Sequence, residues 1–566
     1  MTDEHGAGRP GHGPIAALWD SLPEPLKHKL LPGFTGKRHL LDVAGWCLRS
    51  GNPGLTPVAV DAVRTAFGEN PLDGAMAKEL LAVEPLRQLL PEPTRRSLAG
   101  LASLWRRPES IAYYHRLLAR RDFERTLDFI EQSAAREPEN LFWREQAVAM
   151  GLVGNAPDRA ESVALAGFPS LPEMAPLKDC AAARILAFRG RGADAARLYR
   201  QTADVFGPAF AGVGAGLALL AEGDRASASL LLIGGLRHAP WNTSLLLRLY
   251  DLLAGHDEEV RPLGGSVAVL LYSWNKAVEL DATLRSLLQS ELAGASLFVL
   301  DNGSTDGTAE VLRSWQTRFD SRLGPGRFTV LTLPVNIGAP AARNWLMRLQ
   351  AVARHDFACY LDDDVEIPSD WLLRLGAAVH HYPEAGVWGC KVVDHANGAL
   401  IQSADSHLLV DEDGPPPDLS RLAPNPFRLS DLHIQTLDCG LLDILRPCAS
   451  VTGCCHLFRT RDLLEVGDFA IHLSPSQYDD MERDLRLCEA GRFPVYQGHL
   501  GVRHRKRTGA ASRVSDREEG NALGNKYKMQ TMHERSALVA AMHAERALLD
   551  ADLWRKLGLV ERALLG

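Results

Sequence analysis

The spacing of apolar and polar residues changes once along the chain, and this change predicts two kinds of structure. Residues 15–256 carry apolar side chains at helical spacing, interrupted by prolines, which predicts an all-helical region. From residue 266 onward, short apolar runs bounded by turns alternate with helical stretches, as in "SVAVLLYSW", "VELDATLRSLLQS" and "ASLFVLDNGSTDGT". Strands that alternate with helices of this length predict an α/β domain with a mostly parallel sheet and helices on both faces.

The second part of the helical region, residues 111–256, contains an internal repeat. Two segments, "RRDFERTLDFIEQSAAREPEN" and "EGDRASASLLLIGGLRHAPWN", each join a turn with an aspartate to a helical run and a Pro-x-Asn. Their turn residues Asp122 and Asp224 lie 102 residues apart, with further turns at Asp158 and Asp194 between them. That distance equals three units of about 34 residues, the period of the tetratricopeptide repeats that this stretch loosely resembles. Such an array would bind a protein partner or only brace the next domain.

Composition and charge narrow the class of protein. A chain of 566 residues is too long for one ordinary core, so we expect two or three domains. The formal net charge of -8 argues against a nucleic-acid partner. The nine cysteines show neither a zinc-binding spacing nor a disulfide framework, which predicts reduced thiols. Without a signal peptide or an apolar run that could cross a bilayer, we expect a cytoplasmic protein with no transmembrane segment, either free or peripheral at the inner face of the membrane.

These patterns predict five consecutive parts of the chain. They are a disordered N-terminus at 1–14, a helical region at 15–110, tetratricopeptide-like helical repeats at 111–256, the sheet domain at 266–507, and a flexible loop with C-terminal helices at 508–566.

The stretch "YLDDDVEIPSDWL" runs an apolar strand directly into three aspartates, Asp362, Asp363 and Asp364. Three adjacent carboxylates repel one another unless they face water or hold a cation, so either a solvated turn or a metal site explains them. Ligands of such sheets bind beyond the carboxyl ends of the strands, and Asp362 and Asp301 both lie at strand ends of that kind. A turn at Asp363 would let one carboxylate meet a divalent cation while the other meets a ribose or a metal-bound water.

Two further loops at predicted strand ends carry polar residues. In "DNGSTDGT", Asp301 could accept the imino N–H of a pyrimidine base, or the loop could be only a well-capped turn. In "NIGAPAARN", Asn336, Gly338 and Arg343 surround the start of a helix, where backbone amides and an arginine suit a phosphate. A structural helix cap would explain this second loop equally well.

Taken together in chain order, these motifs resemble glycosyltransferase family 2, the nucleotide-sugar-dependent enzymes with a GT-A fold. The resemblance covers 266–507 and rests on eight pieces: "VAVLLYSWN", "DNGSTDGT", "NIGAPAARN", "DDD", "PSDWLLRLGAAVHHYPEAGVWGCKV", "VTGCCHLFRTRDLLEVGDF", "YDDMERDLRLCEAGRFPVY" and "VRH". It implies a GT-A catalytic domain of the Rossmann-like type.

The resemblance also implies a role for each matching residue. Asp301 would contact the nucleobase of a UDP-, dTDP- or GDP-sugar donor. Asp362 and Asp364 would form the D-x-D pair, with Asp364 and His504 as ligands of Mn2+ or Mg2+, and an imidazole beside carboxylates favours Mn2+. The residues expected to bind metal are Asp362, Asp364 and His504; those expected to bind the donor or acceptor are Asp301, Asn302, Asn336, Gly338, Arg343, Asp362, Asp363, Gly453, Asp479 and Glu482.

The general base follows from the same resemblance. Counting back from the Ala-Gly that ends the family's last helix places Asp479, Asp480 and Glu482 on its Glu-Asp-x-Asp motif. Asp480 would then deprotonate a hydroxyl of a glycan, polysaccharide or glycoprotein acceptor, and a single displacement would invert the anomeric configuration. Asp479 and Glu482 depart from the motif in side-chain length, which changes the reach of both carboxylates.

Two other functions compete with a glycosyltransferase. A nucleotidyltransferase also binds a nucleotide on such a sheet, but it ordinarily needs a glycine- and lysine-rich phosphate loop, and "LLYSWNKAVELDA" does not supply one. A non-catalytic scaffold would use the repeats to bind a protein and would carry a degenerate nucleotide-sugar domain. The altered Asp479 and Glu482 keep this second alternative open.

Overall fold

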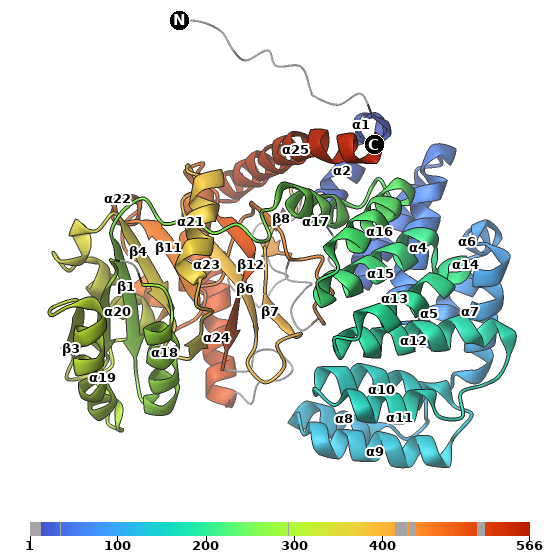
Figure 1. The fold of residues 1–566 in the computed structure, drawn as a ribbon, viewed down its shortest axis with the longest axis horizontal. Coiled ribbons are helices and arrows are strands. Elements are labelled where there is room, and N and C mark those ends of the chain that lie inside the picture. The colour runs from blue at the N-terminus through green and yellow to red at the C-terminus, as the bar shows by residue number, and fades with distance from the viewer. Residues whose placement is uncertain are drawn as a thin grey trace, which may run out of the picture. The chain divides into compact units, whose positions relative to one another are not determined.

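The computed structural model describes residues 13–33, 36–292, 294–413, 427–430, 436–505 and 515–565. Contacts divide the chain into two units (Figure 1). Unit 1 comprises Met1–Ala254, Thr436–Leu442 and Leu553–Gly566, and unit 2 comprises Gly255–Gln435 and Asp443–Asp552. The predicted parts at 1–12 and 506–514 lie outside the described residues.

The described residues of 14–254 in unit 1 form helices and turns, as the sequence pattern predicts. Its elements are α1 (Pro14–Ser21), α2 (Glu24–Leu30), α3 (Lys37–Arg49), η1 (Pro53–Leu55), α4 (Thr56–Glu69), α5 (Gly74–Ala82), α6 (Glu84–Leu89), α7 (Glu92–Leu104), α8 (Ala112–Arg120), α9 (Phe123–Arg136), α10 (Leu141–Val153), α11 (Pro157–Leu165), η2 (Pro172–Met174), α12 (Ala175–Phe188), α13 (Gly192–Gln201), α14 (Ala203–Phe206), α15 (Pro208–Glu222), α16 (Arg225–His238) and α17 (Thr243–Ala254).

The repeated aspartates stand at helix N-termini. The side chain of Asp122 accepts a hydrogen bond from the Arg125 amide and caps α9, and Asp224 caps α16 in the same way through Ser227. A carboxylate at this position satisfies an amide that has no partner within the helix. Asp158 and Asp194 instead lie inside the first turns of α11 and α13. The helices therefore recur with the motif, while the assignment to tetratricopeptide repeats stays a prediction.

Unit 2 contains the strands and the remaining helices. Its elements are β1 (Val267–Ser273), α18 (Ala277–Gln289), β2 (Ser296–Asp301), α19 (Thr308–Leu323), β3 (Phe328–Thr332), α20 (Ala339–Met347), η3 (Val352–Arg354), β4 (Phe357–Leu361), β5 (Val365–Glu366), α21 (Trp371–His381), β6 (Trp388–Asp394), β7 (Ile401–Ser403), β8 (Leu408–Val410), β9 (Phe427–Leu429), β10 (Leu445–Pro447), β11 (Cys455–Arg459), α22 (Thr460–Glu465), η4 (Ile471–Leu473), α23 (Asp479–Glu489), β12 (Val495–His504), α24 (Asp516–Gln530) and α25 (Arg535–Leu565), the last of which continues into unit 1.

A mixed sheet of ten strands forms the centre of unit 2 (Figure 1). Its strand order is β10-β12-β6-β11-β4-β1-β2-β3, with β5 paired to β12 and β7 paired to β6. The pairs β1–β2, β2–β3, β1–β4 and β6–β12 are parallel, and β11 runs antiparallel between β4 and β6. The predicted α/β domain with a mostly parallel sheet is confirmed, and the antiparallel strands lie in its second half.

Helices cover both faces of this sheet. On one face, alternate residues of β1 such as Val269 join a core with α18, α19 and α21 that includes Leu284, Trp315 and Leu375. On the other face, Tyr272 of β1 lies under the guanidinium of Arg343 from α20. Because successive strand side chains point to opposite faces, β1 is buried from both sides, which explains its nearly continuous apolar sequence.

The C-terminal helix α25 contributes to both units. Its first part joins a second core of unit 2 through Leu538 and Met542, together with Phe427 and Leu485. Within unit 1, its last part binds the start of α1, where the Ala16 amide donates to Glu561 at 2.9 Å. The last part of the helix lies within Leu553–Gly566 and thus belongs to unit 1.

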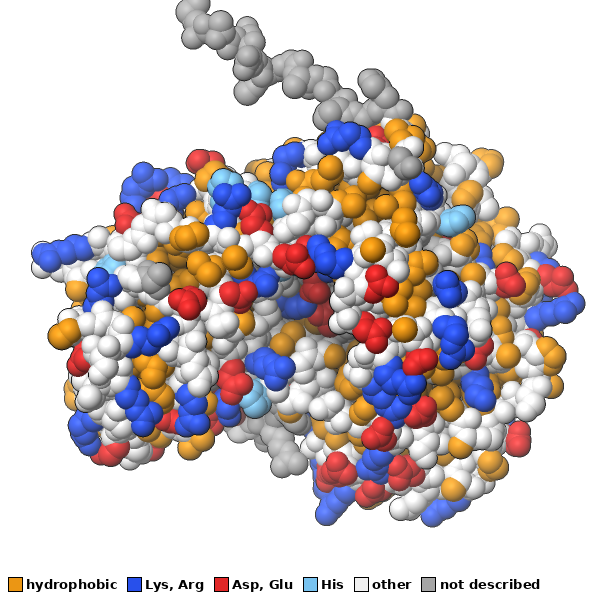
Figure 2. All heavy atoms as spheres, viewed as in Figure 1, with side chains coloured by type: hydrophobic (Ala, Val, Ile, Leu, Met, Phe, Trp, Pro, Cys, Tyr) orange, Lys and Arg blue, Asp and Glu red, His pale blue; other side chains and the backbone are white. Residues whose placement is uncertain are grey.

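The surface carries charges of both signs. On the face drawn in Figure 2, basic and acidic side chains of the described residues are interspersed rather than separated into fields of one sign. Within the described residues, no helix is both long and apolar enough to span a membrane.

Gly376 in α21 tests how closely the segment before β1 packs on this helix. A Cβ at Gly376 would stand 2.0 Å from the carbonyl oxygen of Arg261, so the backbone must move to admit it. We expect Gly376→Ala to lower the free energy of unfolding by roughly 1–3 kcal/mol, measured by chemical denaturation. The control is Gly524→Ala in α24, where a Cβ meets nothing within 4 Å; it should stabilise by about 0.5–1 kcal/mol. Equal effects of the two substitutions would contradict the close packing.

Candidate active site

The carboxyl ends of the parallel strands β1, β2 and β4 lie at the same edge of the sheet. Strand pairing aligns Ser273 with Asp301, and Leu270 with Tyr360. Beyond Leu361 the chain turns through Asp363 and Asp364 before β5 begins. The edge thus brings together the aspartate loops that the sequence places far apart, as expected for a ligand site in such a sheet.

His504 reaches the aspartate run through strand pairing. In β12, His504 pairs with Val365 of β5, the residue directly after the aspartates. Its Nε2 lies 3.0 Å from Oδ1 of Asp364. The Nδ1 of the same ring lies 2.8 Å from Oε1 of Gln402. When Nδ1 of a neutral ring donates to Gln402, Nε2 carries a lone pair that faces the Asp364 carboxylate. A proton or a metal ion between Nε2 and that carboxylate is then favourable.

Lys276, which the sequence analysis did not select, supplies positive charge to the aspartate run. It follows β1, and its ammonium donates to Oδ1 of Asp363 at 2.9 Å and to Oδ2 of Asp364 at 2.8 Å. Burial by itself would raise the pKa of Asp364, but the contacts with His504 and Lys276 outweigh it and hold that pKa far below the usual range. At Asp363 burial prevails over Lys276 and raises the pKa to about 6. Its position just after the end of β1 is the feature of the sequence from which Lys276 could have been selected.

Asp362 faces a different set of neighbours. Its carboxylate is about a quarter exposed, at 26%. A carboxylate oxygen of Asp362, the sulfur of Cys454 and a ring nitrogen of His504 lie within 4.8 Å of one another. Burial raises the pKa of the Cys454 thiol well above its usual range. A protonated thiol is a poor metal ligand, so Asp362 and His504 are the better donors of this group. An imidazole among the ligands matches a transition metal better than Mg2+.

Arg343 is buried and its main partner is a carboxylate. Its Nη1 lies 2.5 Å from Oδ2 of Asp479, and its Nη2 lies 3.8 Å from Oδ1 of Asp362. The guanidinium also stands over the rings of Tyr272 and Phe469. Burial alone would lower the pKa of Arg343, but Asp479 and the other acidic neighbours hold it well above the usual range. The predicted phosphate ligand is therefore already an ion-pair partner of the carboxylates.

The first turn of α23 sends its three acidic side chains to three different partners. Asp479 binds Arg343, while Glu482 is buried and binds Arg486 at 2.8 Å. Asp480 is only partly buried, and its Oδ2 accepts the backbone N–H of Gly453 at 2.8 Å. Among the three acidic residues of this turn, Asp480 thus remains the one open to solvent.

Gly453 is required by the crowding beside it. A Cβ there would lie 2.8 Å from both Nη2 of Arg343 and Oδ2 of Asp480. Its missing side chain leaves room for these two charged groups, while its expected role in binding the donor or acceptor stays a prediction.

The loops after β2 and β3 are joined by their asparagines. The amide group of Asn302 donates to Oδ1 of Asn336 at 3.0 Å and accepts the Ile337 N–H at 3.0 Å. Asn336 also accepts the Gly338 N–H at 2.8 Å. Asp301 is buried, and its carboxylate accepts the Ser304 N–H at 3.0 Å. These contacts support the capped-turn interpretation of both loops, and contact of Asp301 with a nucleobase stays a prediction.

The predicted residues therefore form two adjoining groups. At the end of β4, Lys276 binds Asp363 and Asp364, and His504 contacts Asp364. At the start of α23, Arg343 binds Asp479, and Gly453 binds Asp480. Asp362 joins the groups, since it neighbours His504 on one side and Arg343 on the other. Asn302, Asn336 and Gly338 hold the adjacent loops together.

Comparison with known proteins bears on the sheet domain of unit 2. Residues 268–440 match the model of the family described as glycosyl transferase family 2. These residues are therefore similar to glycosyltransferase family 2, and a helical region precedes them in the chain. A search of curated proteins gave no match.

Two solved structures of glycosyltransferases are similar over part of the chain. The crystal structure of GalNAc-T7 with UDP, GalNAc and Mn2+ is 14% identical, covers 47% of this chain and 47% of its own length, and has a TM-score of 0.33. The crystal structure of S. aureus TarS is 14% identical, covers 42% of this chain and 36% of its own length, and has a TM-score of 0.28. The chain thus spans about half of the first and about a third of the second, and TM-scores this low carry no argument about function.

The ion pair between Arg343 and Asp479 can be measured by a double-mutant cycle. Arg343→Gln or Asp479→Asn alone leaves a buried charge without its partner, so each should lower the free energy of unfolding by roughly 3–5 kcal/mol. The double variant should lose clearly less than the sum. The matched control is the surface pair of Arg348 and Asp468, 2.6 Å apart and more than half exposed, where each change should cost about 0–1 kcal/mol. Similar losses at both pairs would contradict the structural role of the buried one.

Proposed function

We propose that unit 2 is an inverting, metal-dependent glycosyltransferase that moves a sugar from a nucleoside diphosphate to a hydroxyl group of a glycan, polysaccharide or glycoprotein. The observation that carries the proposal is the position of Asp362. It adjoins the Asp364–His504 pair on one side and Arg343 at the start of α23 on the other. A candidate cation-binding group and a candidate base thus lie at one edge of the sheet, in a unit that contains most of residues 268–440, which match a glycosyltransferase family.

Asp362, Asp364 and His504 would hold the metal ion. The donor set fits a divalent ion, because the contact between Nε2 of His504 and the Asp364 carboxylate is favourable with a cation between the two atoms. A bound Mn2+ or Mg2+ would neutralise charge on the leaving diphosphate, and Mn2+ is favoured because of the imidazole. Lys276 would shift from Asp364 toward the diphosphate, since the metal takes over part of its role as counter-ion.

Asp480 would act as the general base. It is partly exposed, and the Gly453 N–H holds one of its oxygens. Its carboxylate takes the proton of the acceptor hydroxyl while that oxygen forms a bond to the anomeric carbon. The bond between the anomeric carbon and the diphosphate oxygen breaks, and the electron pair leaves with the diphosphate. Attack opposite the leaving group inverts the configuration at this carbon.

The other residues would position the two substrates. Asp301 would contact the base of a UDP-, dTDP- or GDP-sugar, beside the loop that Asn302 and Asn336 hold in place. Arg343 would keep Asp479 and the first turn of α23 in register with Asp480. The helical unit would bind the acceptor or a protein that carries it, as tetratricopeptide-like repeats do.

A scaffold without catalysis is the second candidate, and one observation favours it. Lys276 and Arg343 already give internal partners to Asp363, Asp364 and Asp479, so the buried carboxylates are neutralised without any ligand. In a scaffold these ion pairs would be permanent, whereas in a transferase the pairs of Lys276 must exchange for metal and diphosphate.

Nucleotide binding distinguishes the two candidates. We expect one of UDP, GDP and dTDP to bind the full chain in the presence of Mn2+, measured by isothermal titration calorimetry, and EDTA to abolish the binding. Asp364→Ala should weaken it at least roughly tenfold, because a direct metal ligand is lost. Asp468→Asn, an exposed aspartate of the same unit, should leave it unchanged. Failure of all three diphosphates to bind would favour the scaffold.

Turnover tests the base separately from binding. Asp480→Asn keeps the size of the side chain but cannot accept the proton, so we expect turnover to fall roughly 10²–10⁴-fold while diphosphate binding stays within a few-fold. The assay uses the nucleotide sugar whose diphosphate binds, and follows release of the diphosphate with acceptor or with water. Asp468→Asn is again the control. Unchanged turnover of Asp480→Asn would exclude Asp480 as the base.

A further inference from the structure

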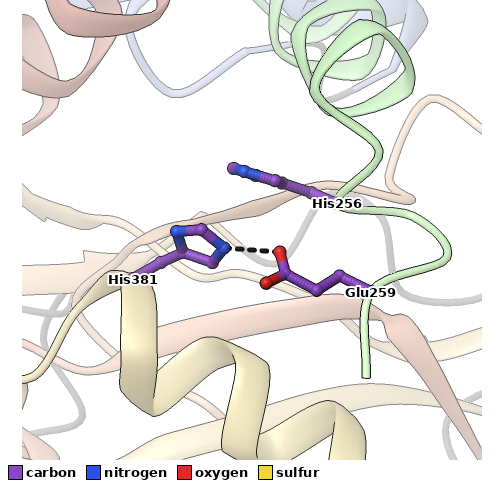
Figure 3. A group of neighbouring side chains, drawn as sticks. All are labelled: His256, Glu259 and His381. Atoms are coloured by element: carbon purple, nitrogen blue, oxygen red, sulfur yellow. Dashed lines mark hydrogen bonds and ion pairs between the residues drawn. The ribbon is translucent and has the colours of Figure 1, made fainter. Parts of the chain in front are cut away.

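A second group of metal-binding side chains lies in unit 2 and shares no residue with the candidate active site. It consists of His256 and Glu259, on the segment that follows α17, and His381, the last residue of α21. Figure 3 shows the imidazole of His256 above that of His381, with the carboxylate of Glu259 reaching the same ring. The ring centroids of the two histidines are 4.1 Å apart, and Nε2 of His381 lies 2.6 Å from Oε2 of Glu259.

The three side chains offer the donors of a transition-metal site. One ligand atom from each lies within 4.8 Å of the others. Zn2+ binds imidazole nitrogen and carboxylate oxygen at about 2.0–2.2 Å, which puts neighbouring ligand atoms about 3.3 Å apart. Small rotations of the side chains therefore suffice to bring all three onto one ion. Burial lowers the pKa of His381 and so favours the neutral ring that binds metals, although Glu259 opposes the shift.

The surrounding contacts hold these ligands in place. Arg261 forms an ion pair with Oε1 of Glu259, the oxygen that does not face His381, and orients the carboxylate. Two hydrogen bonds fix the segment on α21: Arg374 donates to the Asp257 carbonyl at 3.0 Å, and the Arg261 amide donates to the Leu373 carbonyl at 3.0 Å. Ligands supported in this way lose little freedom when they bind a metal.

We propose that His256, Glu259 and His381 bind one Zn2+ ion, which fastens the segment at 256–261 to the end of α21. Two histidines and one glutamate form a three-ligand set, and the fourth position takes water or a further ligand. The site is independent of the proposed transferase chemistry, since none of its ligands serves the nucleotide. The alternative is a purely structural hydrogen bond between His381 and Glu259 beside a stacked histidine.

Zinc retention by the full chain tests the site. The His504→Gln protein is used throughout, so that the aspartate run lacks its imidazole and excess Mg2+ can occupy it. After equilibration with Zn2+ and gel filtration we expect one equivalent of zinc by elemental analysis. Adding His381→Gln or Glu259→Gln should weaken zinc binding at least tenfold. Adding His380→Gln, which changes the neighbouring exposed histidine, should leave it unchanged.

Cobalt gives a second readout that does not depend on the stability of the variants. Co2+ added to the His504→Gln protein should give the intense visible absorption of a four-coordinate site, and one equivalent of Zn2+ should remove it.

Zinc should also raise the Tm of this protein by several degrees but not that of the protein that also carries His381→Gln. Absence of the cobalt bands, zinc binding only at millimolar concentration, or an equal loss with His380→Gln would each overturn the proposal.

Discussion

The carboxylates of Asp362, Asp363, Asp364, Asp479 and Asp480 lie at one edge of the sheet in unit 2, and the compensation of their charge governs the structure around them. Asp363, Asp364 and Asp479 are all at most 6% exposed, which would be prohibitive for isolated charges. Their partners come from three separate elements: Lys276 follows β1, Arg343 lies on α20, and His504, with its imidazole, ends β12. Each of these elements is therefore tied to the acidic groups by polar contacts as well as by packing.

The same crowding of charge explains the small residues nearby. Gly453 leaves space for Arg343 and Asp480, and any side chain there would push the two apart. Gly303 has a φ of 75° and lies so close that a Cβ would meet the Val335 backbone at 2.4 Å. The loops after β2 and β3 can thus approach closely enough for Asn302 to bridge to Asn336. The positive φ of Gly303 lets the two loops come close together, and the missing side chain of Gly453 lets Arg343 and Asp480 lie side by side.

An edge held by internal ion pairs has a consequence for ligand binding. In the proposed transferase, a metal ion and a diphosphate would carry opposite charges, and they would exchange with Lys276 and Asp364 without leaving either one buried and unpaired. Both side chains of the Arg343–Asp479 pair are buried, whereas the Lys276 side chain is more than a third exposed. In that proposal the pair of Lys276 and Asp364 changes partners, and the pair of Arg343 and Asp479 keeps α23 in position.

The sequence by itself determined the kinds of elements, their order and the chemical types at the site. Alternation of apolar runs with helical stretches predicted the α/β domain, and the order of short motifs indicated the family and selected Asp362, Asp364, His504 and Asp480. These signals are local, because periodicity and motifs depend on residues near one another in the chain.

Only the tertiary structure decided which groups become partners. Lys276 meets Asp364 across 88 positions of the chain, and Gln402 meets His504 across 102, so no local pattern could pair them. The pairing of β5 with β12 places His504 at the aspartates, and a shift by one residue would turn its side chain to the other face. His256, Glu259 and His381 likewise come together only because the segment before β1 lies along α21. Long-range register, which the sequence does not display, selects the partner of each charged group.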